Sequence, residues 1–179
     1  MDTLTVTAQA IGIAAMVLTV FSMQCRSNRA FFLCQELGGI LFALHFAMLG
    51  AWSGALMNIF GIIRPEILRR ENIAKSKWTL YGLILLLLLC SLSSIFIFGE
   101  KWYLLSLVTA AQATGTCCMW TRKGKVIRMG QLFAVSPLWI TYNSLLPVPS
   151  IGGILTEIIN IMSCLLALFR YRKTGFTER

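Results

Sequence analysis

The sequence has few charged side chains, and this scarcity limits the class of protein that it can encode. Only 13% of its 179 residues are charged, whereas an average soluble domain carries about 25%. Hydrophobic residues make up 57%, and the mean hydropathy is +0.74. A domain of this size cannot bury so much apolar surface in its own core. We therefore expect much of that surface to face lipid, which argues against a soluble domain, a disordered chain and a nucleic-acid-binding module.

Acidic residues and histidine are the scarcest chemical groups. The chain has seven Asp and Glu residues and a single histidine, His45. The sequence shows no nucleophile paired with a base, no cluster of metal-ligand residues and no phosphate-binding loop. We therefore expect no enzymatic activity, no bound metal and no cofactor.

Apolar segments occupy nearly the whole chain. A helix needs about 20 largely apolar residues to cross the hydrocarbon core of a bilayer. Seven segments are candidates, at 4–23, 30–49, 53–68, 79–98, 102–120, 126–146 and 151–169. The third is interrupted at Arg64-Pro65-Glu66, where we expect a kink or the end of the helix. The sequence thus predicts an all-α integral membrane protein with seven transmembrane helices.

The basic residues predict the orientation of these helices. Of the sixteen Lys and Arg residues, fifteen lie near or beyond the end of the first, third, fifth or seventh segment, and only Lys101 falls on the opposite side. Cytoplasmic loops carry the excess of basic residues in membrane proteins. We therefore expect the N-terminus outside and the C-terminus in the cytoplasm. The basic loops are short, so they indicate topology and contact with anionic lipid rather than nucleic-acid binding.

The chain also matches itself weakly at an offset of 96 residues, which becomes 99 after an insertion near 147–149. The matched polar pairs are Arg26 with Arg122, Gln35 with Gln131, and Asn58 with Glu157. We predict a triple-helix bundle over 1–70, a cytoplasmic loop and linker helix over 71–99, and a second triple-helix bundle with a basic tail over 100–179. A single linker crossing gives both bundles the same orientation, in a 3-1-3 arrangement typical of transporters.

Several motifs resemble those of the YgjV-type bacterial inner-membrane protein family. They are the segment 44–50 (Leu-His-Phe-Ala-Met-Leu-Gly) with Gly54, Asn58 and Arg64, and Tyr142-Asn143 with Ile151-Gly152-Gly153 and Glu157. That family is grouped with PQ-loop and SWEET-type proteins, so the resemblance implies a multi-pass protein of the bacterial inner (plasma) membrane. The Pro-Gln pair of the PQ-loop group is absent, and Pro137 is the one kink proline that remains.

Polar residues inside the predicted spans mark a candidate site. An ionisable group near the bilayer centre is costly and often lines a solute path. Glu157 lies within an apolar run, and we expect it to face its repeat mate Asn58 near the midplane. In SWEET-type carriers asparagines of these two helices line the sugar pocket, so the resemblance assigns Asn58 to the first position and Glu157 or Asn160 to the second. The alternative is that each side chain only hydrogen-bonds a neighbouring helix.

Other polar and aromatic residues complete the predicted site. We expect Trp139, Tyr142 and Asn143 to be its nearest neighbours together with His45, for which an interhelical contact is the alternative. Three further residues are predicted to line a vestibule or to join helices, namely Gln35, Gln131 and Trp52. Glu36 is expected to pair with Arg29 or Arg64.

The sequence therefore favours a small-solute membrane transporter that works by alternating access, with a polar site between its two repeats. Its partners would be the lipid bilayer and a small polar solute. We predict that Glu157 is protonated in at least one conformation, because a charged carboxylate loses its hydration in the bilayer, and this leaves coupling to protons open. The alternative is a non-transporting sensor, receptor or assembly protein on a SWEET-like scaffold. The sequence also leaves homo-oligomerisation open.

Overall fold

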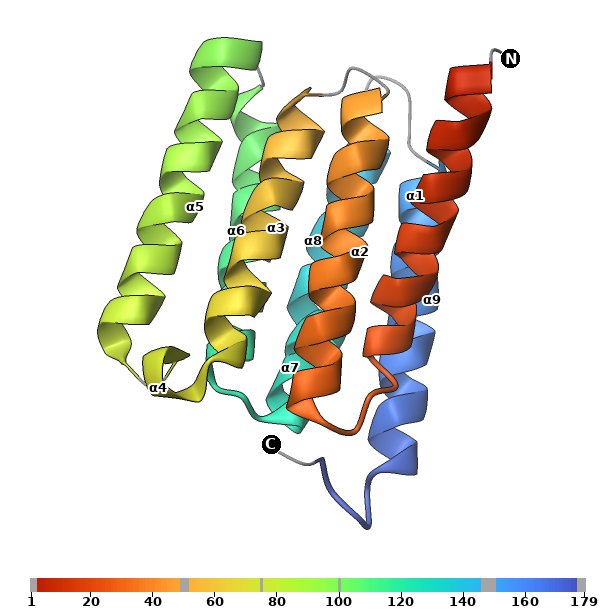
Figure 1. The fold of residues 1–179 in the computed structure, drawn as a ribbon, viewed down its shortest axis with the longest axis vertical. Coiled ribbons are helices and arrows are strands. Elements are labelled where there is room, and N and C mark those ends of the chain that lie inside the picture. The colour runs from red at the N-terminus through yellow and green to blue at the C-terminus, as the bar shows by residue number, and fades with distance from the viewer. Residues whose placement is uncertain (1–2, 49–51, 75, 100, 146–150, 177–179) are drawn as a thin grey trace.

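The computed structural model describes residues 3–48, 52–74, 76–99, 101–145 and 151–176, most of which lie in helices (Figure 1). The helices are α1 (Thr3–Ser22), α2 (Asn28–Met48), α3 (Trp52–Arg69), α4 (Glu71–Ala74), α5 (Lys77–Phe98), α6 (Trp102–Trp120), α7 (Gly124–Gly130), the π-helix η1 (Gln131–Val135), α8 (Ser136–Leu145) and α9 (Ile151–Arg170). The elements α7, η1 and α8 follow one another without a break and form one continuous helix. Each of the seven predicted segments thus corresponds to one long helix, with bounds that differ by at most two residues.

The helix α5 has the plainest sequence signals. Ser76 precedes it in an extended conformation and accepts a hydrogen bond from the backbone N–H of Trp78 at 3.2 Å. Gly99 ends it with a φ of 68°, a conformation that glycine adopts without steric cost. Among the described helices, the stretch Lys77–Ile97 is the one that passes a test of length and composition for crossing a membrane, with a mean hydropathy of 2.5. The number of spans therefore stays a prediction from the sequence.

The long helices are arranged in two rows (Figure 1). In the first row, α2 packs between α1 and α3, and in the second row the α7–η1–α8 helix packs between α6 and α9. The rows meet where α1 contacts α9 and where α3 contacts α6, and α5 packs on α3 and α6. A two-fold relation between the rows would generate this pairing, because it exchanges α1 with α6 and α3 with α9.

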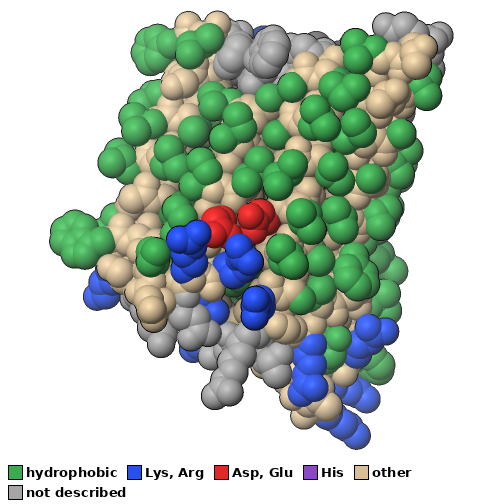
Figure 2. Space-filling view, viewed as in Figure 1, with side chains coloured by type: hydrophobic (Ala, Val, Ile, Leu, Met, Phe, Trp, Pro, Cys, Tyr) green, Lys and Arg blue, Asp and Glu red, His purple; other side chains and the backbone are tan. Residues whose placement is uncertain are grey.

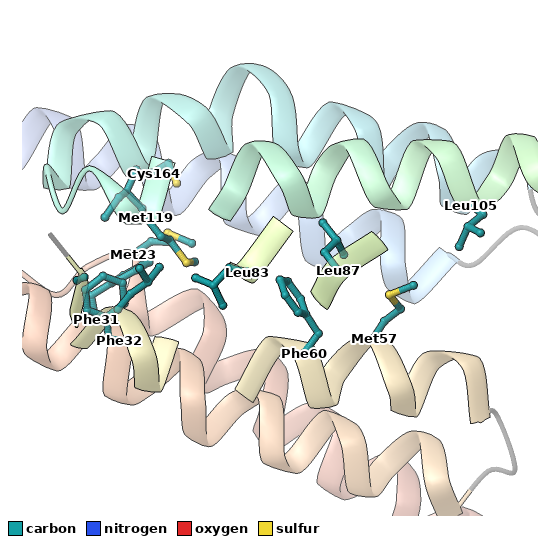
Figure 3. Packing of buried hydrophobic residues seen from close by; sticks show 13 residues of the cluster. Met23, Phe31, Phe32, Met57, Phe60, Leu83, Leu87, Leu105, Met119 and Cys164 are labelled. Atoms are coloured by element: carbon teal, nitrogen blue, oxygen red, sulfur yellow. The ribbon is translucent and has the colours of Figure 1, made fainter. Parts of the chain in front are cut away.

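The hydrophobic core lies between the rows and α5 (Figure 3). Phe31 and Phe32 of α2 and Phe60 of α3 are fully buried there, and they belong to one cluster with Leu83 and Leu87 of α5. Lipid is as apolar as these side chains, so close packing and polar contacts must hold membrane helices together. The polar contacts at the helix ends are therefore expected to matter more than they would in a soluble bundle.

Side chains on the outer surface separate by type along the bundle (Figure 2). Hydrophobic residues cover most of the visible face, while Lys and Arg side chains gather at its lower end. This is the end at which α1, α3, α6 and α9 terminate, and it is called the arginine end below. Exposed apolar residues such as Leu85 and Phe96 of α5 and Phe133 of η1 lie on the sides of the bundle.

Arg128 of α7 is the largest fully buried side chain among the described residues, with 0% of its surface exposed, and it binds the turn that follows α1. Its Nε donates to the carbonyl of Met23 at 3.1 Å, and its Nη2 donates to those of Cys25 at 2.7 Å and Ser22 at 3.4 Å. The last carbonyls of a helix have no partner within the helix and carry partial negative charge. The carbonyls of the last turn of α1 already accept hydrogen bonds from residues 22–25. The guanidinium of the second row therefore mainly supplies donors to the turn that follows α1, at Met23 and Cys25.

Two further arginines bind backbone carbonyls of the opposite row in a reciprocal way. Arg26, which follows α1, donates to the carbonyls of Gly175 at 3.2 Å and Thr174 at 3.1 Å beyond the end of α9. Its repeat mate Arg122, which follows α6, donates to the carbonyl of Leu68 at the end of α3. Arg122 thus binds the end of α3, and Arg26 binds the segment that follows α9, the helix with which a two-fold relation would exchange α3.

Polar contacts at the two edges of the rows also involve equivalent positions. Arg64 of α3 lies 3.4 Å from the hydroxyl of Thr116 on α6, and Ser163 of α9 donates to the carbonyl of Val20 on α1 at 3.1 Å. Ser163 matches Arg64 at the offset of 99, and Thr116 matches Val20 at the offset of 96. The weak sequence repeat therefore coincides with a repeated pattern of contacts.

The sequence predicts a kink or an end of the third helix at Arg64-Pro65-Glu66, and the structure excludes the end, while a kink stays a prediction. α3 does not end at Pro65 but contains it and continues to Arg69. The proline costs one backbone hydrogen bond, but the extra turn lets Glu66 accept bonds from Arg69 and Arg70, three and four residues later. Arg64 consequently lies inside the helix, 7% exposed, and its Nη1 donates to Oε1 of Gln112 on α6 at 2.8 Å.

We expect Arg128→Met to lower the free energy of unfolding by about 2 kcal/mol, because the carbonyls of Met23 and Cys25 in the turn after α1 lose the donor from the second row, while removal of a buried charge offsets part of that loss. Chemical unfolding in detergent micelles, followed by circular dichroism, would measure it. Lys125→Met removes an exposed cation of the same helix and is the matched control. Equal stability of the two variants would contradict the capping role.

Candidate functional site

Glu157 of α9 is the centre of a polar cluster inside the second row. Its Oε2 accepts a hydrogen bond from the hydroxyl of Ser136 at 2.6 Å. The amides of Gln131 and Asn160 lie 3.3 Å and 3.5 Å from the same oxygen. Two of the three donors come from the central helix of the row and one from α9 itself. These four residues are called the Glu157 cluster.

The π-helix η1 explains how two residues of the central helix reach the same carboxylate. In an α-helix, residues five apart differ by about 140° in direction. Here the backbone N–H of Ser136 bonds the carbonyl of Gln131, so one wider turn separates them and both side chains face α9. Pro137 follows directly and has no N–H to give to an α-helical bond. The amide of Gln131 also donates to the hydroxyl of Ser136 at 2.9 Å.

Ser136 is the member of the Glu157 cluster that the sequence analysis missed. The available signal was its place directly before the one proline in the middle of a predicted span, five residues after Gln131. π-Helical turns are frequent at functional sites, and proline is one of the residues around which helices become irregular. A polar side chain at such a turn has a fixed direction, which makes it a good candidate for holding a carboxyl group.

The Glu157 cluster contains a carboxyl group and an unused acceptor but no cation. None of the described hydrogen-bond partners of Glu157 is basic. Asn160 is 2% exposed, and its Oδ1 is buried without a hydrogen-bond partner in the described structure. A buried acceptor of this kind is costly unless a donor reaches it. The cluster can therefore receive a proton, a hydroxyl group or another donor beside the carboxyl group.

The predicted aromatic neighbours lie further along the same central helix. Trp139 and Tyr142 of α8 form an edge-to-face pair with ring centroids 5.5 Å apart, and both are half-buried. The amide of Asn143 donates to the carbonyl of Trp139 at 2.9 Å. Trp139 and Asn143 follow Ser136 by three and seven residues, so these three share one face of α8. Their role in binding a solute stays a prediction.

The expected approach of Asn58 to Glu157 also stays a prediction. Asn58 is half-buried on α3, and α3 and α9 lie at opposite ends of the two rows. The described partners of Glu157 belong to the second row. An approach between the two residues would require both side chains to point toward the axis between the rows.

The remaining predicted residues of the first row make contacts between helices. Nδ1 of His45 on α2 lies 2.7 Å from the carbonyl of Ala8 on α1, so His45 occupies the interhelical contact that was the alternative for it. Gly12 faces this ring, because a Cβ there would lie 2.9 Å from Nδ1. Gln35 donates to the hydroxyl of Ser22 on α1 at 2.8 Å. The side chain of Trp52 lies outside the described part of the structure.

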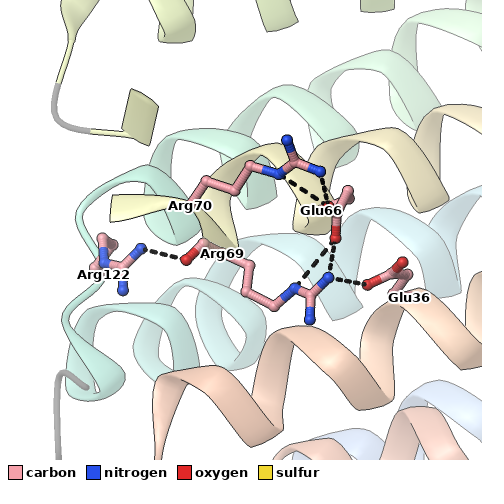
Figure 4. Close-up of polar contacts among 5 residues, drawn as sticks. All are labelled: Glu36, Glu66, Arg69, Arg70 and Arg122. Atoms are coloured by element: carbon pink, nitrogen blue, oxygen red, sulfur yellow. Dashed lines mark hydrogen bonds and ion pairs between the residues drawn. The ribbon is translucent and has the colours of Figure 1, made fainter. Parts of the chain in front are cut away.

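Glu36 pairs with a different arginine from those expected (Figure 4). Its Oε2 lies 3.8 Å from Nη2 of Arg69, rather than pairing with Arg29 or Arg64. Arg69 is within reach because α3 continues past Pro65 and brings this guanidinium between Glu36 and Glu66. Arg64 is instead directed to Gln112 of α6. The result is a network of ion pairs at the arginine end, in which Arg69 of α3 joins Glu36 of α2 to Glu66 of α3.

A cavity of about 560 Å³ lies away from the Glu157 cluster, at the arginine end. It is bounded by the turn between α6 and α7, by the last turns of α9 and by the segment that follows α9. No pattern in the sequence predicts this cavity.

We expect Glu157→Ala to lower the free energy of unfolding by about 1–3 kcal/mol, because the buried donor groups of Ser136, Gln131 and Asn160 lose their common acceptor. Glu157→Gln keeps an oxygen at the same place and should unfold close to the wild type. Thermal unfolding in detergent would compare the two variants. Equal midpoints for the alanine variant and the wild type would show that the cluster contributes nothing to stability.

Comparison with known proteins identifies the chain at the level of its family. No curated protein and no solved structure matches the sequence. The sequence model of one family, Imp-YgjV, described as a bacterial inner membrane protein, matches residues 6–175. This match covers nearly the whole chain, agrees with the resemblance found in its motifs and is consistent with a multi-pass helical protein. The chain belongs to the Imp-YgjV family of bacterial inner membrane proteins.

Proposed function

We propose that the protein is a small-solute carrier of the inner membrane rather than an enzyme, and that the Glu157 cluster forms part of its solute or proton site. The observation that carries this proposal is the cluster itself. It places a carboxyl group without a basic partner and an unused buried acceptor at a π-helical turn. Ionisable groups in membrane helices commonly belong to solute paths or proton relays.

The proposed topology has seven spans in a 3-1-3 arrangement, with the N-terminus outside and the C-terminus in the cytoplasm. Two structural features support it. The helix bounds agree with the seven apolar segments, and the reciprocal caps of Arg26 and Arg122 agree with two equivalent rows. The gathering of cations at the arginine end supports a cytoplasmic position for that end.

The contacts between the rows are compatible with alternating access. The rows meet along two edges, α1 with α9 and α3 with α6, and each edge is a line about which one row could rock against the other. Such rocking of repeats around a fixed central site is the usual mechanism of carriers built from repeats. In this proposal η1 and Pro137 interrupt the regular α-helical hydrogen bonding of the central helix of the second row, beside the Glu157 cluster.

A sensor, receptor or assembly protein is the second candidate, and the caps at the arginine end favour it. Arg128 and Arg122 each join one row to the other through buried or partly buried bonds, and Arg26 does so through exposed ones. A protein that rocks has to keep or exchange these bonds in each cycle, whereas a static scaffold keeps them permanently. Transport measurements decide between the two candidates.

We expect purified protein in proteoliposomes to take up a small polar solute, identified beforehand by thermal-shift screening, and an imposed pH gradient to change the rate of uptake. Glu157→Gln should lose the response to pH, because its amide cannot exchange a proton with the solvent. Glu66→Gln, which changes a carboxylate outside the Glu157 cluster, is the control. If Glu157→Gln transports as well as the wild type and neither responds to pH, proton coupling through Glu157 is excluded.

The orientation has its own test. We expect green fluorescent protein fused after residue 179 to fluoresce, and alkaline phosphatase fused at the same point to be inactive, because the former matures in the cytoplasm and the latter in the periplasm. Fusions after Gly99, at the opposite end of α5, should give the reverse pattern. Active phosphatase at the C-terminus would overturn the proposed orientation.

A further inference from the structure

We propose that the cavity at the arginine end binds the phosphate headgroup of an anionic phospholipid. Three exposed cations line it: Lys123 and Lys125 from the start of α7, and Arg172 from the segment after α9. No acidic residue is among the described residues of its lining. A cavity of about 560 Å³ lined by this charge fits a phosphodiester together with its glycerol.

The wall formed by the segment after α9 is fixed by bonds to the rest of the bundle. Arg26 holds the carbonyl of Gly175 at 3.2 Å. The ring of Phe176 lies 4.5 Å from the guanidinium carbon of Arg128, and its centroid is 5.0 Å from that of Tyr171. Gly124 provides the space for this ring, because a Cβ at that position would lie 2.5 Å from Phe176. The cavity is therefore built from packed residues rather than from a loose tail.

Apolar side chains on one side of the cavity favour a lipid over a soluble phosphate. Met129 of α7 and Leu168 of α9 line the cavity next to the cations. Exposed apolar residues continue away from the arginine end along the same two helices, including Phe133 on η1 and Leu165 on α9. Charge at the helix ends followed by apolar surface along the helices matches the headgroup and acyl chains of a phospholipid. Basic pockets between membrane helices on the cytoplasmic side bind such headgroups.

The proposal is independent of whether the protein transports a solute, and it is tested by binding. Protein in a neutral detergent is titrated with fluorescently labelled phosphatidylglycerol and, separately, with labelled phosphatidylcholine. The double variant K125Q/R172Q removes two cations of the cavity. The matched control, R29Q/K77Q, removes two exposed cations that start α2 and α5 at the same end but do not line the cavity. The unfolding midpoint of each variant without lipid shows whether it is folded.

We expect the wild type and the control pair to prefer phosphatidylglycerol, and K125Q/R172Q to bind it about tenfold more weakly or worse. Soluble glycerophosphate should compete poorly, because it lacks the acyl chains that would lie along Met129 and Leu168. Equal losses in both double variants would indicate diffuse attraction to the whole basic end and would overturn the site. Competition by glycerophosphate as strong as that by the lipid would replace the lipid with a soluble phosphate.

Discussion

The capping of helix ends by arginines is the interaction on which the arrangement of the two rows depends. Backbone carbonyls at the ends of helices and in the turns that follow them need donors from outside the helix. Arg128 supplies donors to the turn after α1, and Arg26 and Arg122 supply them to the chain beyond α9 and to the end of α3. Each of these bonds runs from one row to the other. Satisfying the backbone therefore also fixes how the rows are placed, which apolar contacts between membrane helices could not do alone.

Although the two rows have the same arrangement of helices, equivalent residues in them make different contacts. Gln35 and Gln131 are equivalent in sequence, but Gln35 bonds to α1, whereas Gln131 bonds to Ser136 and Glu157. The irregular turn before Pro137 accounts for the difference, because it redirects one face of the central helix in the second row toward α9. The first row has no proline at the matching position, since Ile40 and Leu41 stand at the offset of 96 from Ser136 and Pro137. The cluster around a carboxyl group within the helices is thus formed in the second row.

The arginine end combines structural and surface charge in one place. Arg128 is buried and holds α1, while Lys125, one turn earlier on the same helix, is exposed beside the cavity. The positive-inside pattern of the sequence treats both residues as equivalent topological signals. In the folded protein the two residues have different roles, because Arg128 points between the rows and Lys125 points toward the outside. The number of basic residues near a loop therefore does not show which of them stabilise the fold and which form the charged surface.

The sequence by itself determined the helices, the weak repeat and the family, because long apolar segments and their loops are local features. It also indicated Glu157 as an ionisable residue within a membrane helix, since an isolated carboxyl group in an apolar run is visible without a fold. Only the tertiary structure decided its partners, the continuation of α3 through Pro65, the pairing of Glu36 with Arg69 and the cavity beside α7. The physical reason is the same in each case. These features depend on which face a helix presents to a neighbour distant in sequence, and a π-helical turn or a proline inside a helix changes that face without changing the apolar pattern.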